Sequence, residues 1–239
     1  MISNLFHAAF YNPIYNILVA LVAWMPWESV GLAVIILTIL IRVILLPFTL
    51  SAARTQRAMR SLEPKLKELK ELHKGDKEKE ALATLELYKA ERVNPFASIL
   101  TLFIQIPVLL ALYWVFRYEP FTTLDHARLY AFTPLPAHAA LFFLGISVAG
   151  KSIVLAAVAG IMQYAQAVTA LSGSQPASGS GAGADFQRVM GTQMKYVFPL
   201  LIAVICYTTS AAVALYFITT NGIGALQELY VRAKYKNQS

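Results

Sequence analysis

Acidic side chains are missing from every long apolar segment of this 239-residue chain. Proton-coupled pumps and transporters use Asp, Glu or His relays within the membrane, so their absence argues against that class. The four histidines do not supply such a relay, because they are scattered and lie outside the clear apolar spans. They are His7, His73, His126 and His138.

Cysteine is almost absent as well, since Cys206 is the single one. One cysteine excludes an internal disulfide, and an apolar neighbourhood makes Cys206 most simply a packing residue. No metal-ligand spacing, P-loop, nucleophile elbow or glycine-rich phosphate loop occurs. We therefore expect neither an enzyme nor an ATP-driven machine, and neither a metal nor another cofactor.

Only 14% of the residues are charged, and 57% are apolar. In a soluble domain roughly a quarter of the residues are charged. Several uncharged stretches exceed the ~20 residues that a helix needs to cross a bilayer. The composition predicts an all-α integral membrane protein. Eleven of the 20 Lys and Arg lie between Arg54 and Arg92. By the positive-inside rule this block lies in the cytoplasm, and the rule explains the basic cluster better than nucleic-acid binding does.

An outer N-terminus and a basic cytoplasmic tail require an odd number of spans, and five fit the apolar segments. A sixth span within 129–150 is the alternative, although prolines and a glycine interrupt that segment. Residues 1–28 contain an apolar stretch that is too short to cross the bilayer. We expect it to form a helix in the outer interface, with Trp24 and Trp27 at headgroup level. The predicted order is an outer interfacial helix within 1–28, the first span at 29–50, a cytoplasmic helical hairpin at 51–92, the second span at 93–116, an external connection at 117–151, the third span at 152–171, a flexible cytoplasmic linker at 172–194, the fourth and fifth spans within 195–230, and a basic cytoplasmic tail at 231–239.

Arg42 is the most informative residue, because it is the only charge between Ser29 and Ala53. An arginine stays charged in a protein, and an unpaired one at membrane depth costs several kcal/mol or more. Snorkelling of the side chain to the inner headgroups is one explanation. We favour an inward-facing, functional Arg42, since intramembrane charges almost always face the protein interior.

Polar residues also recur at helical spacing along the other spans. Such stripes could converge on a hydrated groove that lowers the cost of Arg42, or could make ordinary interhelical hydrogen bonds worth ~0.6–2 kcal/mol each. For any single Thr or Gln the ordinary hydrogen bond is the simpler interpretation. The candidate groove residues are Arg42, Thr38, Thr101, Gln105, Gln163, Tyr216, Thr220 and Asn221.

Four stretches together resemble the YidC family of membrane protein insertases. They are TILIRVILLPFT (Thr38 to Thr49), the hairpin SLEPKLKELKELHKGDKEK, LYKAERVNPFASILTLFIQIPVLLALYWVF (Leu87 to Phe116), and the closing KYVFPLLIAVICYTTSAAVALYFITTNGIGALQEL. The resemblance implies five transmembrane helices enclosing a hydrophilic groove, with a cytoplasmic helical hairpin. It aligns Arg42 with the family's groove arginine and Thr38 with a groove-lining position.

The same resemblance implies a membrane protein insertase and chaperone that works without nucleotide. Its partners would be nascent membrane proteins and membrane lipids, with the ribosome and the Sec translocon as further candidates. The location it implies is the bacterial inner membrane, with the N-terminus outside and the C-terminus in the cytoplasm. Two other classes stay open from the residues alone: a small polytopic channel or transporter, and a scaffold that assembles other membrane proteins.

Overall fold

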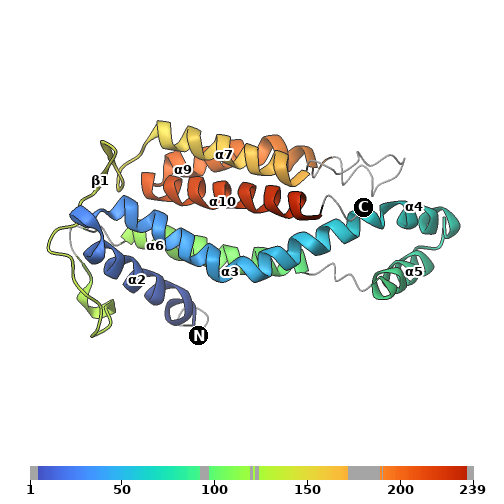
Figure 1. Ribbon diagram of the computed structural model, residues 1–239, viewed down its shortest axis with the longest axis horizontal. Coiled ribbons are helices and arrows are strands. Elements are labelled where there is room, and N and C mark those ends of the chain that lie inside the picture. The colour runs from blue at the N-terminus through green and yellow to red at the C-terminus, as the bar shows by residue number, and fades with distance from the viewer. Residues whose placement is uncertain are drawn as a thin grey trace.

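The computed structural model describes residues 5–91, 97–118, 121, 124–171, 189 and 191–235. The predicted linker at 172–194 lies largely outside these residues, as does the end of the predicted tail. Helices dominate the described chain and run along one long axis (Figure 1). The helical hairpin and the C-terminus lie at one end of that axis, and a small β-hairpin lies at the other.

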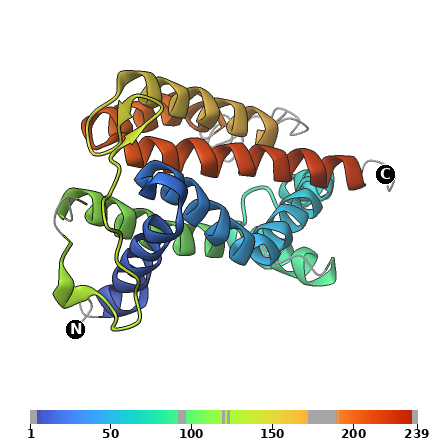
Figure 2. The ribbon, with the colours of Figure 1, turned by 60° about the vertical axis from the view of Figure 1, so that its left-hand side comes forward.

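The longest helix is α3 (Val30–Ser61), which continues from an apolar first part into a basic last part. Its first turns are the best buried, with Val30, Ala33 and Val34 fully covered. On one side α3 packs against α2 (Asn12–Trp24) and α6 (Ala97–Tyr118), and on another against α10 (Ala211–Tyr235). Figure 2 shows this crossing of α2, α3 and α6 below α10. Because α3 touches both groups of helices, it connects the two halves of the bundle.

The second half consists of α7 (Ile153–Leu171), α9 (Phe198–Thr208) and α10, with the π-helix η4 (Gln193–Val197) leading into α9. The chain turns sharply between α9 and α10, where Thr209 has φ −96° and ψ −102°. Gly160 lets α7 approach α9 closely, since a Cβ there would lie 3.1 Å from both the Pro199 carbonyl oxygen and the Ala203 Cβ. Small residues at such contacts let membrane helices pack backbone to backbone.

This close approach gives a prediction for Gly160→Val. The added side chain has no space against the Pro199 carbonyl, and overpacking of this kind typically costs about 1–3 kcal/mol. We expect a clear drop in the thermal unfolding temperature of the purified protein in detergent. Gly191→Val is the matched control, because a Cβ at Gly191 meets nothing within 4 Å. Equal unfolding temperatures for the two variants would show that the α7–α9 contact can relax freely.

The N-terminal segment begins with the π-helix η1 (His7–Tyr11) and continues into α2. One face of α2 is buried against α3 and α6. Trp24 at the end of α2 and Trp27 in the following 3₁₀ turn η2 (Pro26–Glu28) are largely exposed. The position of α2 relative to the bilayer stays a prediction, but the helix is a packed part of the core.

The connection between α6 and α7 has no α-helix within its described residues 124–152. It holds the 3₁₀ turn η3 (His126–Arg128) and an antiparallel hairpin of β1 (Phe142–Phe143) and β2 (Ile146–Ser147). The Glu28 carboxylate accepts hydrogen bonds from the backbone N–H groups of Ala137 and His138. These described residues therefore fold over the end of the bundle and do not form the alternative sixth span.

The hairpin consists of α4 (Glu63–Leu72) and α5 (Lys77–Ala90). The turn between them uses Gly75 with φ +103°, a backbone conformation that favours glycine. A salt bridge of 2.5 Å between the Lys65 ammonium and the Glu91 carboxylate links the two helices. Asp76 caps α5, because its carboxylate accepts a hydrogen bond from the Lys79 backbone N–H at 3.1 Å.

The cap predicts a pH dependence of α5. The Lys79 backbone hydrogen bond, together with the Lys79 side chain, holds the pKa of the Asp76 carboxyl below its ordinary value. The stabilisation is therefore complete above the ordinary Asp pKa and is lost as the pH falls through the lowered one. We expect the hydrogen-exchange protection factor of the Lys79 amide to fall over that range. Asp76→Asn, which keeps a capping oxygen, should remove the pH dependence, and an unchanged profile in this variant would contradict the assignment.

Two described helices are long and apolar enough to cross a membrane: 30–52 within α3, and α7. Two shorter apolar helical stretches, 106–117 in α6 and 193–208 across η4 and α9, accompany them. At a rise of 1.5 Å per residue, the second of these is about 24 Å long, less than the ~30 Å hydrocarbon core.

Candidate functional site

Arg42 lies near the middle of the apolar part of α3, about 18 Å along the axis from Val30 and about 15 Å from Ala52. Its side chain reaches across to α10. The Arg42 Nη2 group donates a hydrogen bond to the Thr220 carbonyl oxygen at 2.9 Å, and Nε donates to the Thr220 hydroxyl oxygen at 3.3 Å. The guanidinium therefore contacts protein rather than extending along α3 toward a headgroup layer.

The Arg42 charge has no acidic partner in the described part of the chain. No described Asp or Glu forms an ion pair with it, and its side chain is half-buried. A guanidinium has five N–H donors in a planar fork suited to carboxylates. Because the Thr220 contacts use only two of them, Arg42 keeps donor capacity for an acidic group that enters from outside the fold.

Three other candidate residues lie on the same two helices. Tyr216 is buried on α10, one turn before Thr220. Asn221 is also buried, and its Nδ2 amide group has no hydrogen-bond partner among the described residues. Thr38 is buried one turn before Arg42, and its hydroxyl donates to the Val34 carbonyl oxygen at 2.7 Å, which is an ordinary bond within one helix.

The remaining candidates lie on α6 and α7. Gln163 is half-buried on α7, which packs directly against α10. One turn further, the Gln166 side chain lies against Gly224 of α10, where a Cβ would clash with it. Thr101 and Gln105 belong to the described backbone of α6, but their side chains lie outside the described part. The structure thus joins Arg42 and Thr220 directly, and the groove role of the whole set stays a prediction.

Sequence reasoning missed a polar cavity of about 490 Å³ at the end of the bundle opposite the α4–α5 hairpin. None of the predicted site residues lines it. Its two basic residues, Arg117 and Lys151, directly flank the predicted second and third spans. Both lie on the predicted outer side, where the positive-inside rule disfavours basic residues. This departure from the rule is the sequence signal that could have pointed to the cavity.

Two long apolar helices, α7 and the first part of α3, and an arginine that bonds α3 to α10 are consistent with an all-α membrane protein. The sequence profile of the family described as 60Kd inner membrane protein matches residues 11–238. The chain therefore belongs to the 60Kd inner membrane protein family. The predicted resemblance to the YidC family is confirmed, because similar proteins from several bacteria are named membrane protein insertase YidC.

A relative from Fusobacterium nucleatum, named membrane protein insertase YidC, is 28% identical over 204 residues, which is 85% of this chain and 86% of the relative. A Coxiella burnetii protein of the same name is 27% identical over 213 residues, covering 87% of this chain but 32% of its own length. One from Ectopseudomonas mendocina is 45% identical over 85 residues, covering 36% of this chain and 15% of the relative. The chain thus spans most of the first relative and about a third or less of the other two.

Proposed function

We propose that this chain is a bacterial inner-membrane insertase and chaperone, which moves nascent membrane proteins into the bilayer without nucleotide hydrolysis. The observation that carries the proposal is the Arg42 guanidinium, held by Thr220 between α3 and α10 and unpaired with any described carboxylate. Membership of a family whose relatives are named insertases supports it. The five spans would be α3, α6, α7, α9 and α10, with the N-terminus outside.

The proposed groove runs along the Arg42 face of α3 and α10. A short, hydrophilic, acidic tail of the client would enter from the cytoplasmic side and pair transiently with Arg42. The spare N–H donors of the guanidinium suit a carboxylate. The pairing would offset part of the cost of moving charge into the membrane, and thus lower the barrier to translocation.

The α4–α5 hairpin would receive the client first. Leu72, Leu82 and Leu85 are exposed apolar residues on it, at 76%, 56% and 49% exposure. Exposed leucines on an otherwise charged hairpin suit transient contact with the apolar segment of a client. Lys65 and Glu91 tie the two helices together, so that the hairpin would move as one unit.

The energy for insertion would come from burial of the client's apolar segment in lipid, at ~25 cal/mol per Å². The short stretch 193–208 would favour a locally thinner bilayer beside the groove, because a short span is matched by thinning. No chemical step is required of the protein, whose residues act by solvating a polar tail in transit.

Reconstitution into liposomes tests this function. The purified protein is presented with a single-span client carrying a short acidic tail, and insertion is read as protection of the tail from external protease. We expect protection with the protein and little in protein-free liposomes. A parallel measurement of ion and small-solute release tests the channel alternative. Solute release without tail protection would reject the insertase.

A further inference from the structure

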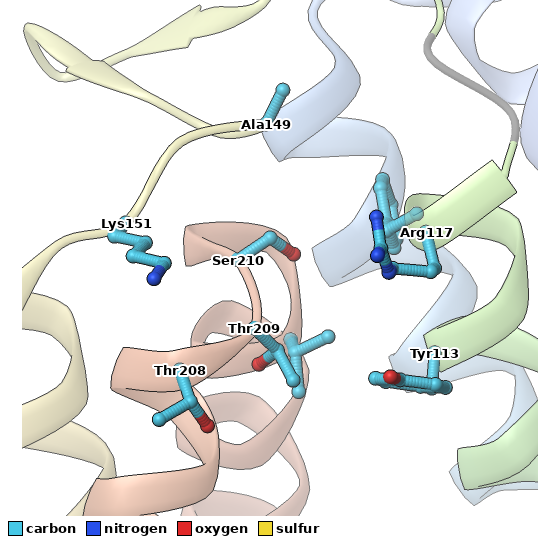
Figure 3. Close-up of a pocket in the computed structure, with 9 residues that line it drawn as sticks. Tyr113, Arg117, Ala149, Lys151, Thr208, Thr209 and Ser210 are labelled. Atoms are coloured by element: carbon cyan, nitrogen blue, oxygen red, sulfur yellow. The ribbon is translucent and has the colours of Figure 1, made fainter.

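The polar cavity at the end opposite the hairpin lies where three segments meet. The end of α6 supplies Tyr113, Phe116 and Arg117, the link before α7 supplies Ala149 and Lys151, and the α9–α10 region supplies Thr208, Thr209, Ser210 and Val213. Figure 3 shows Arg117 and Lys151 on opposite sides of Ser210. Residues distant in the sequence thus form one site, at the end of the molecule opposite the α4–α5 hairpin.

The charge of this cavity is positive. Arg117 and Lys151 are both exposed, and neither forms an ion pair with a described carboxylate. Among the described carboxylates of the connecting segments, Asp125 pairs with Arg128 at 2.8 Å and Glu28 accepts from two backbone N–H groups. None of the described residues that line the cavity is acidic. Two cations without a described counter-charge, facing one space, favour an anion there.

Ser210 gives an independent indication of a ligand. Its side chain is only 4% exposed, and its hydroxyl oxygen has no hydrogen-bond partner in the described part of the chain. Figure 3 shows this hydroxyl directed toward the side of the cavity where Arg117 lies. Because buried hydroxyls are nearly always hydrogen-bonded, an unpartnered one facing a polar cavity calls for a bound group or water.

The backbone around Ser210 is already satisfied and fixed. The backbone N–H of Ala211 donates to the Gly150 carbonyl oxygen at 2.7 Å, and that of Ala212 donates to the Val148 carbonyl oxygen at 2.9 Å. The hydroxyls of Thr208 and Thr209 donate to carbonyl oxygens of their own helix. Of the three hydroxyl groups in this turn, the one on Ser210 is therefore available to donate a hydrogen bond to a ligand.

We propose that this cavity binds a phosphate group, with an anionic phospholipid headgroup of the outer leaflet as its source. Arg117 would bind phosphate oxygens with its fork of donors, Lys151 would neutralise the charge, and Ser210 would donate one hydrogen bond. Phe116 and Val213 add an apolar wall against which acyl chains can lie. The proposal rests on the membrane placement of the proposed function but not on insertion itself.

Titration of the delipidated, full-length protein in detergent tests the assignment. Short-chain phosphatidylglycerol is the probe, and native mass spectrometry counts the bound lipid. We expect one tight site, a loss of affinity of about tenfold or more in the Arg117→Gln/Lys151→Gln double variant, and a severalfold loss in Ser210→Ala. The unfolding temperature of Ser210→Ala should stay unchanged, which separates a binding role from a structural one.

Three further ligands test which chemical group binds and whether a lipid supplies it. Short-chain diacylglycerol, which lacks the phosphate, should not occupy the site. Displacement of the lipid by millimolar inorganic phosphate would identify free phosphate as a sufficient ligand, whereas lipid binding without displacement would identify the headgroup. Equal binding of diacylglycerol, or displacement by a carboxylate-rich peptide as readily as by phosphate, would overturn the proposal.

A control variant removes the same charge from the other end of the molecule. Lys65→Gln/Lys79→Gln lowers the net charge by as much as the cavity double variant but leaves the cavity intact. We expect its affinity for phosphatidylglycerol to match the wild type. An equal loss in both double variants would show that net charge, rather than this cavity, holds the lipid. Because insertion is not measured, a failure here leaves the proposed function standing.

Discussion

Arg42→Ala is expected to lower the insertion rate of a client with an acidic tail by about 10- to 100-fold. This range follows from the ~1.5–3 kcal/mol that a hydrogen bond to a charged group contributes, converted into a rate. Arg42→Lys should retain part of the activity, because it keeps the charge but loses the planar fork. The measurement is protease protection of the tail as a function of time in liposomes.

Two controls separate this effect from loss of fold or of net charge. A client whose tail carries Asn and Gln in place of Asp and Glu should insert at nearly the same rate with Arg42→Ala as with wild type. Lys74→Ala removes an equal charge from the hairpin turn and should leave the acidic-tail client unaffected. If Arg42→Ala slows both clients equally, Arg42 supports the α3–α10 packing rather than the passage of charge.

Asn16→Ala is expected to lower the free energy of unfolding by about 2–4 kcal/mol, since it leaves four partly buried polar groups without their partner at once. Asn16 is only 3% exposed. Its amide nitrogen donates to the carbonyl oxygens of Asn12 at 2.8 Å and Arg128 at 2.9 Å, and its oxygen accepts from the Tyr130 backbone N–H and the Thr133 hydroxyl, both at 2.7 Å. One side chain thus fastens the α6–α7 connection to α2.

Thermal unfolding in detergent gives the size of the Asn16 effect, and hydrogen exchange at the Tyr130 amide locates it. Asn12→Ala is the matched control, because it truncates the same side chain one turn earlier while leaving the Asn12 carbonyl in place. We expect this control to behave like wild type. Protection of the Tyr130 amide that survives in Asn16→Ala would show that the connection is held by other contacts.

The helical part of this structure could be read from the sequence because its signals are local. A stretch of about twenty residues without charge is typical of a membrane-spanning helix, and Gly75 followed by Asp76 marks a break between two helices. The polar stripes left open whether they converge on a groove or make ordinary interhelical hydrogen bonds, and the structure places Arg42 against Thr220. Whether that face is a hydrated groove is still a prediction.

The α6–α7 connection and the polar cavity could not be read in the same way. Asn16 bonds to residues more than 110 positions away, and no periodicity links them. The cavity around Ser210 is likewise made by three separate segments, and only the charges of Arg117 and Lys151 were visible beforehand. Contacts that depend on how helices are arranged leave no pattern in a single segment.

Disulfide cross-linking of a stalled client to α10 shows whether the acidic tail passes beside Arg42. In a Cys206→Ala background, a cysteine is introduced by Thr220→Cys beside Arg42 or, as the control, by Ile44→Cys, whose position on α3 is 69% exposed. We expect a cysteine in the client's acidic tail to cross-link at position 220 and not at position 44, and Arg42→Ala to weaken this cross-link. Efficient insertion with no cross-link at position 220, or with equal cross-links at both positions, would contradict a groove that passes the tail beside Arg42.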